Sequence, residues 1–418
     1  MVGGQTTNAR QPAGRTAGGR LWRWRGGEDG NMDTRFAALL DAPAPVVTAH
    51  LDARSDQPKA LERLELRWRN VRRDLEGAGA DQATLDAVEE AVTSEGAHIG
   101  GDSIVVVGAG GKVLLRRPLP DPPPGNVDRA HVGPLPHFLP VVSAEQSALS
   151  HVVVIADKVG ADLYARTGPV GDHAEGKLGG DDVVERSVDG DTENIQRSAP
   201  GGWSQRRFQQ RSENTWERNA SEAAEAVVAL ADEVSAQLVV LGGDVRATGF
   251  LADALPQRIQ AITRPIEAAS RAEGASIEHM ADDVHRLVRT VSAERLTAVL
   301  ATFDEELGQQ DRAVDGPVAV VTALQRATVE TLLVSSKASG DRTAWVGPSP
   351  EHLALDRNDL TAGMGVDEPV EASLIDACIR AALGTGAQVV VVPSTKVKDG
   401  VAAILRHTGT AAVTTGRD

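Results

Sequence analysis

The sequence contains one cysteine and one tyrosine among 418 residues, and aromatic residues make up only 3% of it. The lone Cys378 excludes an intramolecular disulfide framework and is typical of a protein of the reducing cytoplasm. No apolar run approaches the length of a membrane span, so no membrane segment is predicted. Basic residues are outnumbered, 43 against 59 acidic ones, and the net charge is −16. Such an acidic body repels nucleic acid, so any RNA contact must come from local basic patches.

A chain of this length is too long for one hydrophobic core, so two or three domains are expected. Residues 1–31 carry arginines among glycine, alanine and threonine, without the apolar segment of a signal peptide. They are predicted to be a disordered arm or a non-native N-terminal extension. The remainder is predicted to form three α/β domains, at residues 32–146, 147–275 and 276–418.

The first domain contains an amphipathic helix predicted at Lys59–Glu76. Its apolar residues recur at spacings of three and four, and Trp68 lies on this stripe, which assigns it to the core. The other faces carry five arginines, namely Arg63, Arg67, Arg69, Arg72 and Arg73. They form either a solvated surface balanced by acidic neighbours or a surface that faces RNA.

The rest of the first domain is predicted from hydrophobic runs and turn residues. The glycine-rich stretch 108–112 lacks Walker spacing and runs into another strand, which favours a hairpin over a phosphate loop. The proline-rich segment 118–140 is predicted to be a linker that contains His131 and His137. The predicted strands are Val46–Leu51, Ile104–Val107 and Val113–Arg116, and a second helix is predicted at Ala83–Val92.

The second and third domains alternate strands and helices, which indicates α/β layers. The second is predicted to have strands at Val152–Ala156, Ala161–Arg166 and Leu238–Leu241, and helices at Asn214–Ser235 and Gly249–Ala254. The third is predicted to have helices at Ile277–Val291, Glu294–Leu307, Pro317–Thr328, Ser373–Leu383 and Gly400–His407, and strands at Thr331–Ser335, Gln388–Val392 and Ala411–Thr415. Cys378 lies on the apolar side of its helix and is predicted to be core.

The segment 201–219 is locally basic within the acidic protein and is predicted to be a loop. It opens with a glycine pair, which allows backbone conformations closed to other residues. Arginine forks match phosphates, and aromatic rings stack on bases, so this composition suggests RNA binding. The residues singled out are Gly201, Gly202, Trp203, Ser204, Gln205, Arg206, Arg207, Phe208 and Arg211.

The order of the three blocks, with the strand at 151–157 and the segment 201–219 before a long helix, resembles the archaeo-eukaryotic class-1 release factors and Pelota. The resemblance is most specific to their bacterial branch (baeRF), which includes Balon-type ribosome hibernation factors. It implies an N-terminal domain for the decoding site, an RNase H-like middle domain that carries a loop toward the peptidyl-transferase centre, and a C-terminal L7Ae-like α/β/α sandwich. The implied partners are the 70S ribosome, through rRNA of both subunits, and a translational GTPase such as elongation factor Tu.

The chain departs from the active members of that family at one motif. Active release factors carry Gly-Gly-Gln, whereas Trp203 and Ser204 separate Gly202 from Gln205 here. A bulky tryptophan stands where hydrolysis needs a close backbone approach. The resemblance, combined with this departure, implies a cytoplasmic factor that occupies the A site of idle ribosomes without hydrolysis. The alternative is a peptidyl-tRNA hydrolase that uses Gln205.

A third interpretation is a metal-dependent nuclease built from Asp157, Asp162 and Asp244, because RNase H-like domains support two-metal chemistry. The competing interpretation gives these carboxylates structural roles in a turn, on a strand surface and at a strand end, and it is preferred. No zinc spacing, nucleophile elbow or dinucleotide fingerprint is present. No metal and no cofactor is predicted.

Overall fold

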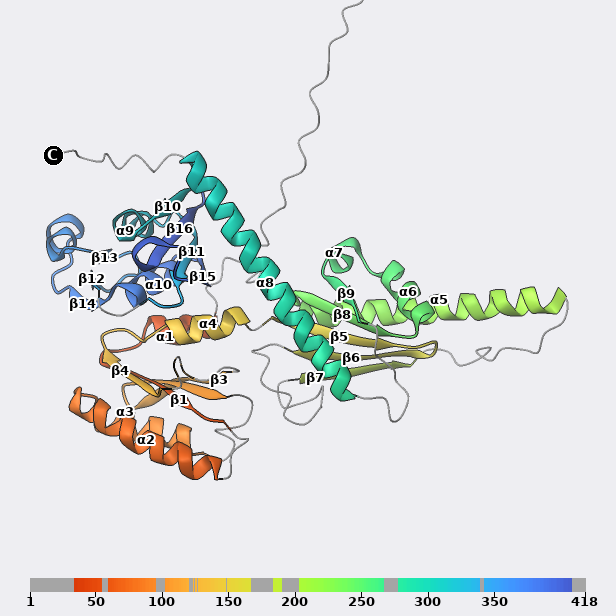
Figure 1. The fold of residues 1–418 in the computed structure, drawn as a ribbon, viewed down its shortest axis with the longest axis horizontal. Helices are drawn as coiled ribbons and strands as arrows, with labels where there is room; N and C mark the ends of the chain where they lie inside the picture. The colour runs from red at the N-terminus through yellow and green to blue at the C-terminus, as the bar shows by residue number, and fades with distance from the viewer. Residues whose placement is uncertain are drawn as a thin grey trace, which may run out of the picture.

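The computed structural model describes residues 34–54, 59–94, 102–119, 123, 125, 127–147, 149–166, 183–189, 203–266, 277–338 and 342–407. It is an α/β protein with separate sheets in its N-terminal, middle and C-terminal parts, which confirms the predicted fold class (Figure 1). None of the helices in these ranges combines the length and the apolarity needed to span a membrane.

The N-terminal sheet is antiparallel and has the order β3-β2-β1-β4. Alternate residues of β1 enter different cores: Val47 and Leu51 pack under α2 and α3, whereas Val46 packs against α1 and α4. This alternation is the period of two expected for a strand covered on both faces. The elements are α1 (Thr34–Leu40), β1 (Val46–Asp52), α2 (Ala60–Gly77), α3 (Gln82–Thr93), β2 (Ser103–Ala109), β3 (Lys112–Leu119), β4 (Arg129–Gly133) and α4 (Leu139–Ser147).

The hairpin between β2 and β3 is confirmed, with positive φ at Gly110 and Gly111 in its turn. The prediction of a linker at 118–140 is wrong for its second half. Arg129–Gly133 forms β4, which pairs with β1, and α4 follows it. The prolines misled the prediction because Pro134 and Pro136 follow β4 without interrupting it, and Pro140 lies in the first turn of α4, where proline is tolerated.

Helix α4 joins the N-terminal sheet to the C-terminal part of the chain (Figure 1). At its start, the Asp376 carboxylate accepts a hydrogen bond from the Phe138 backbone N–H at 2.9 Å and contacts His137 Nδ1 at 3.2 Å. At its end, the Gln146 amide donates to the Val391 carbonyl at 2.9 Å and accepts from the Val391 N–H at 2.6 Å. One hydrophobic cluster runs from α1 and α4 into the C-terminal helices.

The middle sheet has the order β7-β6-β5-β8-β9, antiparallel across β5, β6 and β7 and parallel across β5, β8 and β9. This is the predicted RNase H-like arrangement. Helices α5 and α6 cover one face, and the first half of α8 covers the other. The elements are β5 (His151–Ala156), β6 (Gly160–Arg166), β7 (Val183–Asp189), α5 (Trp203–Glu233), β8 (Leu238–Gly243), α6 (Val245–Ala254), α7 (Gln257–Gln260) and β9 (Thr263–Pro265).

Helix α8 (Ile277–Gln309) is one continuous helix, so the prediction of two helices at 277–291 and 294–307 is wrong. Its apolar stripe changes partner instead of ending: Val288 packs on the middle sheet and Phe303 on the C-terminal sheet. No glycine or proline lies between the two halves to break it. At the change of partner, Arg295 donates to the Gln237 carbonyl at 2.9 Å, and burial lowers the pKa of Arg295.

The C-terminal part is an α/β/α sandwich, as predicted. Its sheet has the order β10-β16-β11-β15, with α9 and α10 on one face and the second half of α8 on the other. Cys378 is fully buried on α10, and burial raises the pKa of its thiol to about 12. The elements are β10 (Ala313–Asp315), α9 (Pro317–Gln325), β11 (Val329–Ser335), α10 (Leu374–Gly384), β15 (Gln388–Val392) and β16 (Val401–Leu405), and a small sheet is formed by β12 (Thr343–Val346), β13 (Leu353–Ala354) and β14 (Val370–Ser373).

The helix predicted at Gly400–His407 is wrong, because Val401–Leu405 forms strand β16 between β10 and β11. Alternate residues of β16 enter the cores on both sides of the sheet, so every position is apolar. A continuous apolar run gives no periodicity that distinguishes a buried strand from a buried helix. The strand predicted at Ala411–Thr415 lies outside the described residues.

We expect Trp68→Ala to lower the free energy of unfolding by about 3–5 kcal/mol, because the side chain is only 1% exposed within the core under α2. The matched control is Leu66→Ala on the same helix, where the side chain is 54% exposed and stability should change little. Thermal and denaturant melts of the two variants measure the difference. Equal losses would contradict the assignment of the two faces of α2.

Candidate functional site

The segment predicted as a loop at 201–219 is helical from Trp203 onward, because α5 begins there and not at Asn214. The loop prediction is therefore wrong for residues 203–213, whereas the helix predicted from Asn214 onward is confirmed. Gly201 and Gly202 lie outside the described residues. The residues after Trp203 are mainly glutamine, arginine and glutamate, which favour helix, and none is glycine or proline. Because the helix begins this early, α5 extends well past the middle sheet (Figure 1).

The backbone of α5 brings the singled-out residues of this segment into helical register. Gln205 lies in the first turn, and Trp203, Arg207 and Arg211 succeed one another at spacings of four. Residues four apart share one side of a helix, so a tryptophan and two arginines run along the projecting part of α5. The side chains of 203–214 lie outside the described part of the structure.

The root of α5 is fixed to the middle domain. Trp216 is buried, and Lys158 Nζ lies 5.3 Å from the centre of its ring. Asn219 is buried as well and donates from Nδ2 to the Lys158 carbonyl at 3.2 Å. The same lysine pairs with Asp244 at 3.5 Å. These contacts hold the helix from Trp216 onward, so the residues before it are carried on a rigid support.

The three carboxylates of the nuclease interpretation have structural contacts. Asp157 accepts from the N–H groups of Val159 and Gly160 at 2.8 and 2.9 Å, which closes the β5–β6 turn. Asp162 accepts from the Ser187 hydroxyl on the neighbouring strand.

Asp244 caps α6 by accepting from Arg246 N at 3.0 Å and Ala247 N at 3.3 Å. Burial alone would raise the pKa of Asp244, but these hydrogen bonds and the Lys158 charge outweigh it and lower the pKa. Across the ranges that the structure describes, no three His, Cys, Asp or Glu side chains are grouped to hold a metal ion. The contacts therefore match the structural roles preferred from the sequence.

The five arginines of α2 fall into two groups. Arg67 and Arg72 are half-buried and paired with carboxylates inside the domain. Hydrogen bonds with Asp86 and Glu76, and a close contact with Glu89, raise the pKa of Arg72 against the opposing effect of burial. The other three, Arg63, Arg69 and Arg73, are exposed.

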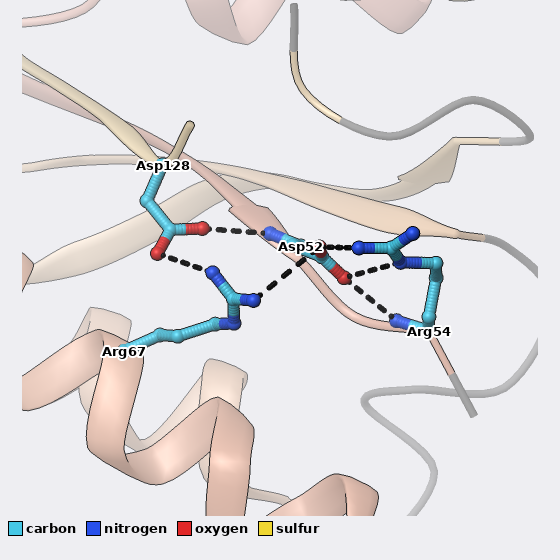
Figure 2. A network of polar contacts seen from close by, with 4 residues as sticks. All are labelled: Asp52, Arg54, Arg67 and Asp128. Atoms are coloured by element: carbon cyan, nitrogen blue, oxygen red, sulfur yellow. Dashed lines mark hydrogen bonds and ion pairs between the residues drawn. The ribbon is translucent and has the colours of Figure 1, made fainter. Parts of the chain in front are cut away.

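Arg67 belongs to a network that the sequence did not reveal (Figure 2). Its guanidinium donates to Asp128 at 2.9 Å and to Asp52 at 3.4 Å. Arg54 donates to both carboxylate oxygens of Asp52, at 3.1 and 2.6 Å, and the Asp52 N–H donates to Asp128 at 2.9 Å. The network ties α2 to the end of β1 and to the start of β4.

Asp52 is the centre of this network and is 5% exposed. Burial raises the pKa of its carboxyl, but the hydrogen bonds from Arg54 and the charge of Arg67 prevail and lower it. One feature of the sequence could have indicated this network: Asp52 follows the predicted apolar strand Val46–Leu51 directly, and Arg54 stands two residues later. A buried carboxylate needs such partners.

These features define an α/β protein of three parts whose RNase H-like middle part carries a projecting helix with basic first turns. Residues 150–309 match the model of the bacterial archaeo-eukaryotic release factor family 2. This match confirms the predicted resemblance to the bacterial branch of these release factors. The narrower likeness to Balon-type hibernation factors remains a proposal.

Several known proteins are similar to this one over most of its length. The uncharacterised protein Rv2629 of Mycobacterium tuberculosis strain H37Rv is 27% identical over 385 residues, which cover 90% of this chain and 97% of that protein. Among solved structures, the archaeal termination factor aRF1 is 16% identical over 88% of this chain and 95% of its own, with a TM-score of 0.24. Archaeal Pelota, in a model of its ribosome-bound state, is 13% identical over 91% and 95%, with a TM-score of 0.39.

We expect Arg67→Met to lower the free energy of unfolding by about 1–3 kcal/mol, because it removes a donor from the buried Asp52 and from Asp128. Arg73→Met is the matched control on the exposed face of the same helix and should change stability by less than about 0.5 kcal/mol. Urea melts of both variants provide the comparison. A neutral Arg67→Met would mean that the network adds nothing to stability.

Proposed function

We propose that this protein is a ribosome-binding translation factor that occupies the A site of idle ribosomes, from the decoding centre toward the peptidyl-transferase centre, without hydrolysing peptidyl-tRNA. The family match over residues 150–309 supports a release-factor-like role. The absence of hydrolysis is proposed from the helical start of α5 at Trp203. The role that follows is protection of idle ribosomes in the cytoplasm during stress or dormancy, as in Balon-type factors.

The helical backbone at Gln205 favours binding over chemistry. A glutamine that positions a hydrolytic water needs a loop that can approach the reacting ester closely. Here Gln205 lies in the first turn of a helix of 31 residues, behind Trp203 and Ser204. The first turn of a helix presents free N–H groups that attract phosphate, and Arg206 and Arg207 add charge at the same end. An RNA phosphate is therefore the partner this end suits.

The charge distribution determines how such a factor would bind. The net charge of −16 opposes association with rRNA, so affinity must come from the arginines of α5 and α2. The proposed partner is the 70S ribosome through rRNA of both subunits, with delivery by a translational GTPase such as elongation factor Tu. Hydrolysis of peptidyl-tRNA through Gln205 is the rival, and an assay of peptide release separates the two.

We expect no peptide release when the full chain is added to ribosomes that carry labelled peptidyl-tRNA, because α5 holds Gln205 within a helix. Gln205→Ala should bind those ribosomes as tightly as the wild type and should also release nothing. A bacterial class-1 release factor on a stop codon serves as the positive control. Release by the wild type that disappears in Gln205→Ala would establish the hydrolase instead.

We expect simultaneous replacement of Arg206, Arg207 and Arg211 by alanine to weaken co-sedimentation with empty 70S ribosomes at least about tenfold at physiological salt. The dependence of log affinity on log salt concentration should become shallower by about 2 to 3, because each phosphate that is no longer neutralised lowers the slope by about one unit. The matched control replaces three exposed arginines of the C-terminal half, Arg289, Arg326 and Arg357, by alanine. Equal affinity of the two triple variants would exclude the basic part of α5 from binding.

A further inference from the structure

The small sheet of the C-terminal part has an open edge at β14. Its order is β13-β12-β14, so β14 pairs with β12 on one side and, among the residues that the structure describes, with no strand on the other. Val370 and Glu371 of β14 are exposed, Val370 to 49%. Successive residues of a strand point to opposite faces, so these two side chains lie on different faces of the small sheet. An edge strand presents unpaired backbone N–H and C=O groups that can receive a further strand.

The surface around this edge is negatively charged. We call residues 343–373 the acidic lobe, because they contain six acidic residues and a single arginine. That arginine, Arg357, lies over the ring of Trp345, 5.6 Å from its centre, and Arg342 directly before the lobe pairs with Asp399 at 3.1 Å. The exposed acidic residues of the lobe are Asp356, Asp359, Asp367, Glu368 and Glu371. The lobe therefore favours a positively charged occupant.

The N-terminal arm has the complementary composition. Residues 1–25 contain five arginines and no acidic residue. The run Trp22–Arg25 alternates tryptophan with arginine, and such an alternation is the period of a strand with one apolar and one polar face. The run lies outside the described residues, and nothing in the ribosome-binding function uses it.

We propose that the run Trp22–Arg25 adds to β14 of the same chain as a further strand of the small sheet. The tryptophans then share the face of Val370 and cover its apolar surface, and the arginines share the face of Glu371. Glu371 accepts a hydrogen bond from the Thr343 hydroxyl at 2.6 Å, which holds its carboxylate on that face. Strand addition takes its affinity from backbone hydrogen bonds and its selectivity from alternate side chains. It goes beyond the ribosome-binding function and does not rest on it.

The chain between this run and helix α1 is long enough to reach β14. Eight residues, 26–33, separate Arg25 from Thr34 at the start of α1, and three of them are glycine. They span about 26 Å when extended. Helix α1 and β14 both contact α10 (Figure 1), and a helix with its side chains is only about 10–12 Å across. The acidic residues of this linker follow the run in sequence, so they do not enter the pairing with β14.

The tether favours the arm over other occupants of the edge. A short flexible linker gives the run an effective concentration on the order of millimolar at β14, far above that of a second copy in dilute solution. RNA is repelled by the carboxylates of the lobe. The arginines of the run are therefore engaged in the free protein, and a polyanion that competes for them releases the strand.

The test measures tryptic cleavage within the arm of the full chain at low ionic strength, with the fragments identified by mass spectrometry. A synthetic peptide of residues 1–31 gives the intrinsic rate at each arginine. Cleavage after Arg23 and Arg25 should be at least about tenfold slower in the protein than in the peptide, because a paired strand must open before it is cut. Cleavage after Arg10 and Arg15 should match the peptide. Peptide-like rates at all four sites would overturn the proposal.

Two variants separate strand pairing from general attraction of charges, each compared with its matched peptide. Glu371→Arg should speed cleavage after Arg23 and Arg25 at least about fivefold, because it places like charges on one face of the sheet. The control Glu294→Arg makes the same change at an exposed position of α8 and should keep the protection.

Trp22→Ser with Trp24→Ser keeps every charge, leaves the small sheet unchanged and should also lose most of the protection. Full protection in this variant would overturn the strand pairing in favour of diffuse attraction between the arm and the lobe. Protection that grows with protein concentration would overturn pairing within one chain, in favour of exchange of the arm between two copies.

Discussion

The arrangement of the N-terminal and C-terminal domains depends on the hydrogen bonds of one buried carboxylate, that of Asp376. It lies on α10, and it accepts the Phe138 N–H where α4 begins. A carboxylate at a helix start satisfies a free backbone donor and complements the helix dipole. Together with Gln146 at the other end of α4, it binds the N-terminal sheet to the C-terminal sandwich through one shared core. Two parts of the chain that are distant in sequence therefore form one body.

Helix α8 extends this body to the middle domain. Its two halves belong to different cores, and Arg295 contacts Gln237 where the cores meet. The two arginine-bearing helices therefore belong to domains that are packed together. Helix α2 lies on the outer face of the N-terminal sheet, and α5 extends beyond the edge of the middle sheet (Figure 1). Under the proposed function, in which both helices bind one ribosome, a fixed span lowers the entropic cost of binding, because no flexible joint has to be ordered.

Much of the fold followed from periodicity, and the errors have common physical causes. Helix α2 and the strands β1, β5 and β15 were predicted because an apolar stripe or run ended at turn residues. Strand β16 was missed because both of its faces are buried, which removes the period of two. The start of α5 was missed because a glycine pair and basic residues suggested a loop. The choice between paired and exposed arginines on α2 depends on Asp52, Asp128 and Asp86, whose positions only the tertiary structure gives.

The central claim is that this protein occupies the A site through the projecting start of α5 and the outer face of α2. The most direct measurement is a cryo-EM reconstruction of empty 70S ribosomes incubated with the full chain. We predict density for the N-terminal domain at the decoding centre, with α2 against small-subunit RNA, and for the start of α5 near the peptidyl-transferase centre. A vacant A site, with the protein bound elsewhere on the ribosome or not at all, would contradict the claim.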